Sequence, residues 1–103
     1  MDIATTQRDG TVAVKVTGDV DLLSRELLAR SLADAVGQAE SGVEVDMAGV
    51  AFLDSSGMSA LLSGRRAAED AGLTFRIIAA GDLVRRVMEL TGVWPLLTGQ
   101  GHE

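Results

Sequence analysis

Segments with the periodicity of β-strands alternate along this chain with segments that have the periodicity of α-helices. Valines occupy every second position of residues 11–17, and apolar residues alternate again in residues 43–47. A strand that turns one face to a core has this pattern. Residues 73–79 are expected to form a third core strand, and residues 1–8 a short additional one. Because helical segments separate the core strands, the order predicts an α/β fold with a partly parallel sheet.

Helical spacing predicts three helices, over residues 22–37, about 57–71 and 82–91. Each of them carries an apolar stripe with polar residues elsewhere. In chain order the stripes are Leu28, Leu32, Ala35 and Ala39; Met58, Leu61, Leu62 and Ala68; and Leu83, Val87 and Leu90. Such stripes are typical of helices that pack one side against a sheet.

Glycine and aspartate mark the expected ends of these elements. Asp9-Gly10 is a hairpin turn signal, because glycine accepts the positive φ that such turns need. Gly72 and Gly92 are expected to end the second and third helices, and Asp82 is expected to cap the start of the third.

Two segments are not assigned to a helix or strand. Residues 48–53 are expected to lead out of the second core strand towards the next helix. Residues 93–97 form a short apolar tail, and residues 97–103 are expected to be frayed. The whole chain, residues 1–103, is expected to be a single domain.

The bulk composition fits one packed domain. The chain has 103 residues, 47% of them hydrophobic, which is enough for one core. It has no cysteine, which excludes disulfides and thiolate chemistry and suits a reducing compartment. Neither a signal-peptide pattern nor an apolar run of about 18 residues occurs, so we expect a cytoplasmic protein with no membrane span.

The charge argues against two classes of partner. The formal net charge is −6, and the basic residues are scattered apart from Arg65-Arg66 and Arg85-Arg86. An acidic surface repels phosphate backbones and anionic lipids. We therefore expect neither nucleic acid nor membrane as a partner.

The start of the second helix, Asp54-Ser55-Ser56-Gly57, is the most informative place in the sequence. Aspartate and serine accept hydrogen bonds from the free N–H groups of a first helical turn, so this element is explained as a plain N-cap. The same four residues also fit a second explanation, a phosphorylation site. A phosphate on Ser55 would add about −1.5 to −2 charges at the positive end of a helix, where free N–H groups solvate it.

Other candidates for chemistry are weaker. Asp19 and Asp21 could ligate a metal, but no third ligand has a suitable spacing, and carboxylates beside a turn are commonly caps. His102, the only histidine, lies two residues from the end and is a poor general base. No phosphate-binding glycine loop or nucleophile elbow is present. We therefore expect no catalytic residue, no metal and no cofactor, and Trp94 is expected to cover the core.

Three sequence elements resemble the STAS domain family, and more closely its stand-alone bacterial anti-sigma factor antagonists. Residues 16–21 resemble the Gly-Glu-Leu-Asp element after the first core strand, with Asp19 in place of the usual glutamate. Residues 45–58 resemble the strand and phosphorylation loop, and residues 83–93 the last-helix signature. The resemblance implies an α/β fold with a mixed sheet of about four to five strands and helices packed mainly on one face.

The resemblance also implies a function. Ser55 matches the phosphoacceptor, Ser56 is the second choice, and Asp54 and Asp21 match aspartates beside the acceptor and near the partner-binding face. The full set implied to bind a partner is Asp21, Asp54, Ser55, Ser56, Gly57, Met58 and Ser59. The unphosphorylated form would bind an anti-sigma factor serine kinase and free a sigma factor. Phosphorylation would end this binding, and a phosphatase would restore it.

Alternatives to this function remain open. Some stand-alone STAS proteins are non-catalytic subunits of transport assemblies, including lipid-transport ATPases, and a subunit of another signalling assembly is the further alternative. In such an assembly Ser55 would be only a cap or a contact. The protein is expected to be a monomer or a weak dimer in either case.

Overall fold

A mixed sheet of four strands, in the order β1-β2-β3-β4, is the framework of the molecule. The structure is a computed structural model, and it describes residues 1–98. Strand β1 (Asp2–Arg8) is antiparallel to β2 (Thr11–Val20), whereas β3 (Gly42–Leu53) is parallel both to β2 and to β4 (Thr74–Ala80). The predicted α/β class is therefore confirmed, with four strands.

The predicted hairpin turn joins β1 to β2. Asp9 and Gly10 have φ angles of 54° and 84°, which are the positive values of a two-residue turn whose twist matches the strands. The ladder pairs Arg8 with Thr11 beside the turn and continues without a register shift to Asp2 and Thr17.

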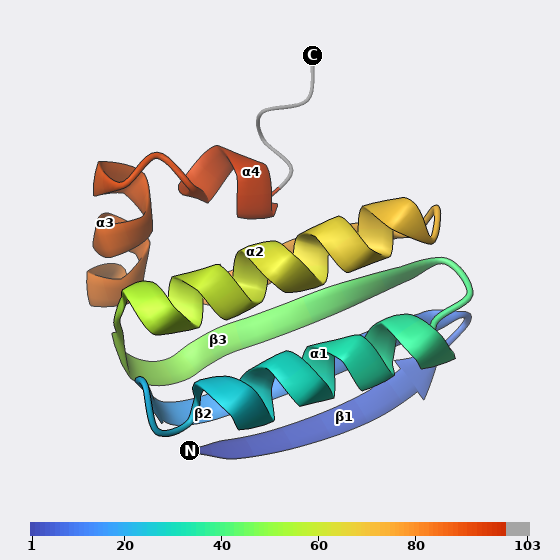
Figure 1. The fold of residues 1–103 in the computed structure, drawn as a ribbon, viewed down its shortest axis with the longest axis horizontal. Helices are drawn as coiled ribbons and strands as arrows, with labels where there is room; N and C mark the ends of the chain where they lie inside the picture. The colour runs from blue at the N-terminus through green and yellow to red at the C-terminus, as the bar shows by residue number, and fades with distance from the viewer. Residues whose placement is uncertain (99–103) are drawn as a thin grey trace.

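Two long helices cover one face of the sheet (Figure 1). They are α1 (Arg25–Gln38) and α2 (Ser55–Asp70), which pack against each other and against the central strands. The valines of β2 and the apolar side of α1 point into the core between these layers, as their spacing predicted. Its fully buried members include Val12, Val14, Val16, Val43, Val45, Met47, Leu28, Leu32 and Leu61.

Strand β3 extends six residues beyond the predicted end, so the expectation that residues 48–53 merely lead out of the strand is wrong. The alternation of β3 stops after Met47 because two register shifts interrupt its pairing with β2. The first shift lies between the pairs Lys15–Asp46 and Thr17–Gly49. The second lies between the pairs Gly18–Val50 and Asp19–Phe52. Each shift inserts one extra β3 residue, as a β-bulge does. Val50 and Leu53 are consequently buried although they are three residues apart.

Helix α3 (Asp82–Leu90) follows β4 and differs from the prediction in its cap and in its buried side. Gly81 is the N-cap, and Asp82 is the first helical residue and makes no side-chain capping bond. The buried residues are Val84 and Met88, whereas Leu83 and Leu90 are 62% and 81% exposed.

The predicted apolar tail is a short helix, α4 (Trp94–Thr98). Leu97 is fully buried in the main core, so the expected frayed segment does not include it. Residues 99–103, among them His102, lie outside the described residues. Trp94 is half-buried against the core, with the guanidinium of Arg85 5.1 Å from its ring centre.

No helix within residues 1–98 combines the length and the apolar character needed to cross a membrane.

Candidate functional site

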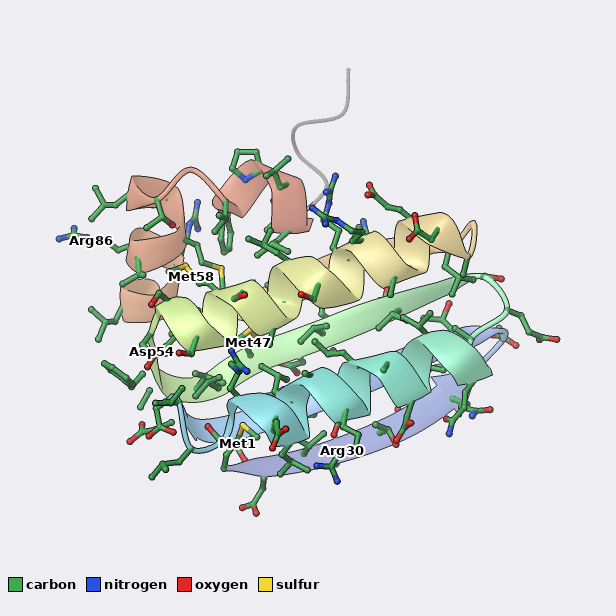
Figure 2. All side chains as sticks on the ribbon, viewed as in Figure 1. Met1, Arg30, Met47, Asp54, Met58 and Arg86 are labelled. Carbon is green, nitrogen blue, oxygen red and sulfur yellow. The ribbon has the colours of Figure 1, made fainter. Side chains whose placement is uncertain are left out.

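The start of α2 lies at the carboxyl end of the two central parallel strands. Val20 and Leu53, the last residues of β2 and β3, are paired, and the N–H of Asp54 donates a hydrogen bond to the carbonyl of Val20 at 3.2 Å. The segment after β2 and the first turn of α2 are therefore neighbours at one edge of the molecule. Figure 2 shows Asp54 at this edge and Met58 one turn further along α2, facing α3.

Asp54 caps α2, as its position before the helix predicted. Its Oδ1 accepts a hydrogen bond from the N–H of Gly57 at 3.1 Å, and its carbonyl accepts one from the N–H of Met58 at 3.1 Å. Asp54 has extended backbone geometry, with a ψ of −175°, whereas Ser55 begins the helix. Such a cap satisfies one of the free N–H groups of the first turn.

Ser55 is exposed at the first position of α2, whereas Ser56 is half-buried. A group attached to the Ser55 oxygen therefore has access to solvent at the helix N-terminus. Ser59, one turn further on, is also exposed. Met58 is half-buried, and its sulfur contacts the end of α3, where it lies 3.6 Å from the Thr91 hydroxyl oxygen. That hydroxyl donates its hydrogen bond to the Val87 carbonyl at 2.9 Å.

Gly57 is buried, and this distinguishes it from the other residues that the resemblance implied as partner contacts. A Cβ atom at this position would lie 2.5 Å from Leu53 Cδ1 and 2.6 Å from Val20 Cγ1. Both distances are shorter than any normal contact between carbon atoms. Gly57 thus lets α2 approach the ends of β2 and β3, and we assign it a packing role rather than a contact with a partner.

Asp21 organises the segment that joins β2 to α1. Its Oδ1 accepts hydrogen bonds from the N–H of Leu23 at 3.0 Å, the N–H of Ser24 at 3.2 Å and the Ser24 hydroxyl at 3.2 Å. Asp19 is exposed, and its carbonyl lies 3.2 Å from the same Ser24 Oγ, as an alternative acceptor for the single proton of that hydroxyl. These bonds give Asp21 the structural role of a turn-stabilising acceptor. Among residues 1–98, no group of three potential metal-ligating side chains forms a cluster.

A comparison with protein families identifies a family that covers almost the whole described chain. The sequence matches the family described as "Mlab, STAS domain" over residues 3–98. The chain belongs to the STAS domain family. A comparison with curated proteins finds no match.

Solved structures agree with the STAS fold. The anti-sigma factor antagonist SpoIIAA in its unphosphorylated form has a TM-score of 0.78 and 22% identity, with 91% of this chain and 84% of that chain covered. An anti-sigma factor antagonist from Mycobacterium paratuberculosis has a TM-score of 0.77 and 25% identity, with 89% and 78% covered. The phosphorylated form of Bacillus SpoIIAA has a TM-score of 0.71 and 21% identity, with 91% and 86% covered.

Exposed apolar side chains lie at the same end of the STAS domain as Ser55, and the sequence patterns did not indicate them as part of the site. Leu22 and Leu23 are 68% and 93% exposed because α1 begins only at Arg25, after the turn that Asp21 holds. Phe52 is 48% exposed beside the buried Leu53. We call Leu22, Leu23, Phe52 and Ser55 the apical surface. The available signal was the Leu22-Leu23 pair, which is separated from the end of β2 by Asp21 alone.

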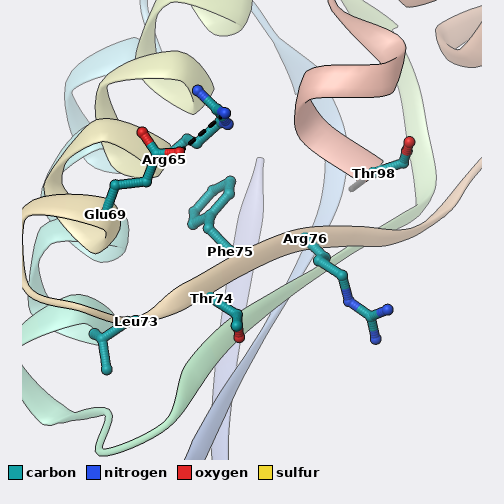
Figure 3. A pocket seen from close by; sticks show the side chains of 7 residues that line it. All are labelled: Arg65, Glu69, Leu73, Thr74, Phe75, Arg76 and Thr98. Atoms are coloured by element: carbon teal, nitrogen blue, oxygen red, sulfur yellow. Dashed lines mark ion pairs between the residues drawn. The ribbon is translucent and has the colours of Figure 1, made fainter. Parts of the chain in front are cut away.

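The cavity shown in Figure 3 lies at the other end of α2 from the apical surface. This cavity has a volume of about 260 Å³ and is lined by residues of α2, α4, β4 and the segment before β4. Arg65 and Glu69 on its wall form an ion pair of 2.9 Å. It is separate from the residues around Ser55.

Replacing Asp54 tests its role as a cap. We expect Asp54→Ala to lower the free energy of unfolding by about 1 kcal/mol, because the Gly57 N–H loses its acceptor. Asp54→Asn keeps an oxygen at that position and is expected to retain most of the stability. Urea denaturation followed by circular dichroism measures both. Equal losses for the two variants would contradict the capping role.

Proposed function

We propose that this STAS domain is an anti-sigma factor antagonist that works by partner switching. Its unphosphorylated form binds an anti-sigma factor that is also a serine kinase, and a sigma factor is thereby released. Phosphorylation of Ser55 abolishes binding, and a phosphatase reverses it. The likeness to the mycobacterial anti-sigma factor antagonist, at 25% identity over most of both chains, supports the class.

The exposure of Ser55 at the start of α2 is the observation that carries the proposal. A kinase must reach the hydroxyl, and solvent exposure permits that access. The first turn of a helix has free N–H groups and a partial positive charge, so the fold tolerates a phosphate there. Ser56 is half-buried and remains the second choice.

The apolar residues of the apical surface explain why the phosphate would act on binding rather than on folding. Leu22, Leu23 and Phe52 offer exposed apolar side chains at the same end of the sheet as Ser55. A partner seated on them would exclude water, and a phosphate in that interface would lose its hydration without gaining a counter-charge. Binding would therefore be lost while the domain stays folded.

The proposal assigns the chain no cofactor and no catalytic residue, because the kinase supplies the ATP site and the chemistry. In this scheme the STAS domain is the substrate of its own partner. The sigma factor and its targets place the process in the cytoplasm.

A phosphorylation assay tests the proposal. The STAS domain is used to isolate its partner from cells of its own source, and the purified complex is incubated with ATP. We expect one phosphate, on Ser55, located by mass spectrometry, and release of the partner as it accumulates. Ser55→Ala is the matched control and should remain unmodified and bound.

Two results would contradict partner switching. One is a phosphate elsewhere than Ser55 or Ser56, or none. The other is a complex in which the partner is a transport ATPase without kinase activity, which would favour the role of a structural transport subunit.

A further inference from the structure

The outer edge of β1 is an open strand edge. β1 is the first strand in the sheet order, and among the described residues only β2 pairs with it. In Figure 1 it forms the lower margin of the sheet. Proteins normally protect such edges with proline, bulges or inward-pointing charges. β1 has no proline, and its pairing with β2 has no register shift.

The hairpin determines which backbone groups face outward. In a hairpin with a two-residue turn, the pair beside the turn, Arg8 and Thr11, exchanges hydrogen bonds, and such pairs alternate along the ladder. The N–H and C=O groups of the even-numbered residues therefore point towards β2. Those of Ile3, Thr5 and Gln7 point away from the sheet, where they are free to pair with another strand.

We propose that a second copy of this chain pairs with that edge, antiparallel, about a two-fold axis at Thr5. Thr5 then faces Thr5 of the second copy, and Ile3 faces Gln7. All three outward-facing residues become hydrogen-bonded pairs in this register. Shifting the strands by two residues or more leaves some of them unpaired. The two sheets join into one continuous sheet.

Charge complementarity selects the same register. It places Asp2 of each copy opposite Arg8 of the other, in pairs that are not hydrogen-bonded and whose Cα atoms approach to roughly 4.5 Å. Both side chains are exposed, and neither takes part in the ion pairs found within residues 1–98. Opposite charges at such positions stabilise strand pairing.

A groove of mixed polarity lies beside the edge, and its polar lining residues include Asp34 and Gln38. Ile3 and Thr5 line it from β1 and Leu27 from α1, and its volume is about 350 Å³. Leu27 is 46% exposed there. The second copy would reduce this exposure, because its own groove lies across the two-fold axis. The apical surface is at the end of the strands rather than along β1, so the inference is independent of the proposed function.

Charge reversal tests the register. The full chain is studied by sedimentation equilibrium at concentrations up to about 1 mM, because one strand pair gives a weak interface. Asp2→Arg and Arg8→Asp are each expected to raise the dissociation constant of the dimer about tenfold. The double variant Asp2→Arg/Arg8→Asp restores the pair with exchanged charges and is expected to recover wild-type association. Circular dichroism confirms that each variant is folded.

A cross-linking experiment tests the axis. Because the chain has no cysteine, Thr5→Cys introduces a single thiol, and the two-fold axis places its two copies at a Cα separation of roughly 5.5 Å, which a disulfide spans. Mild oxidation should give a covalent dimer. Thr6→Cys, the matched control, should cross-link several times less. A monomer at every concentration, a double variant that fails to recover, or equal cross-linking of both thiols would overturn the proposal.

Discussion

Introducing a negative charge at Ser55 should release the partner while leaving the domain folded. We expect Ser55→Asp to weaken binding of the anti-sigma factor at least tenfold, and phosphorylation, with about twice the charge, to weaken it about 100-fold, which corresponds to roughly 2.7 kcal/mol. The physical reason is that the charge enters the apolar apical surface, where the partner replaces water. Isothermal titration calorimetry with the purified partner measures the difference.

Two controls show whether the loss of binding depends on the position of the added charge, rather than on net charge or on unfolding. Ser63→Asp adds the same charge to another exposed position of α2, two turns further on, and should bind like the wild type. Ser55→Asp itself should unfold at the same urea concentration as the wild type or at a higher one, because a carboxylate at a helix N-terminus is favourable. Equal affinities for Ser55→Asp and Ser55→Ala would rule out the charge mechanism.

The second large effect concerns the glycine beneath the site. We expect Gly57→Ala to lower the free energy of unfolding by about 1–3 kcal/mol, although alanine is the better helix former. The added Cβ would lie 2.6 Å from Val20 Cγ1, on a β-branched side chain that has little freedom to move. The first turn of α2 must then shift away from β2 and β3.

Gly37→Ala is the matched control for this substitution. Gly37 also lies in a helix, α1, but a Cβ atom there would meet nothing within 4 Å. We expect it to stabilise the protein by about 0.5–1 kcal/mol through helix propensity and reduced freedom of the unfolded chain. Urea denaturation of both variants gives the comparison. A Gly57→Ala variant as stable as the wild type would show that the close approach at Gly57 is not required.

The limits of sequence reasoning are clearest in β3 and α3. The strand was predicted to end near Met47 because the alternation stops there, but β-bulges continue it to Leu53 with a different spacing of buried residues. Helix α3 has two possible apolar stripes on adjacent sides. The predicted stripe, Leu83, Val87 and Leu90, is as regular as the one that is buried in the structure. Packing against β3 and α4 selects Val84 and Met88.

In the candidate site, too, some features were predicted from the sequence and others were not. The local pattern Asp54-Ser55-Ser56-Gly57 predicted a helix start, and Asp54 caps it as expected. The pattern did not indicate that Gly57 would be buried. It also could not place Leu22 and Leu23 at the same end of the sheet as Ser55, because more than thirty residues separate them in the sequence.

The sequence alone determined the order of the four strands and the first three helices, the turn at Asp9-Gly10 and the cap by Asp54 that precedes Ser55 at the start of α2. These depend on interactions between residues a few positions apart, which side-chain type and spacing record directly. Tertiary structure decided the length of β3, the buried side of α3 and which exposed apolar residues share an end of the sheet with Ser55. Those depend on which segments meet across the sheet, and pairing between distant strands selects among local patterns that are equally favourable by themselves.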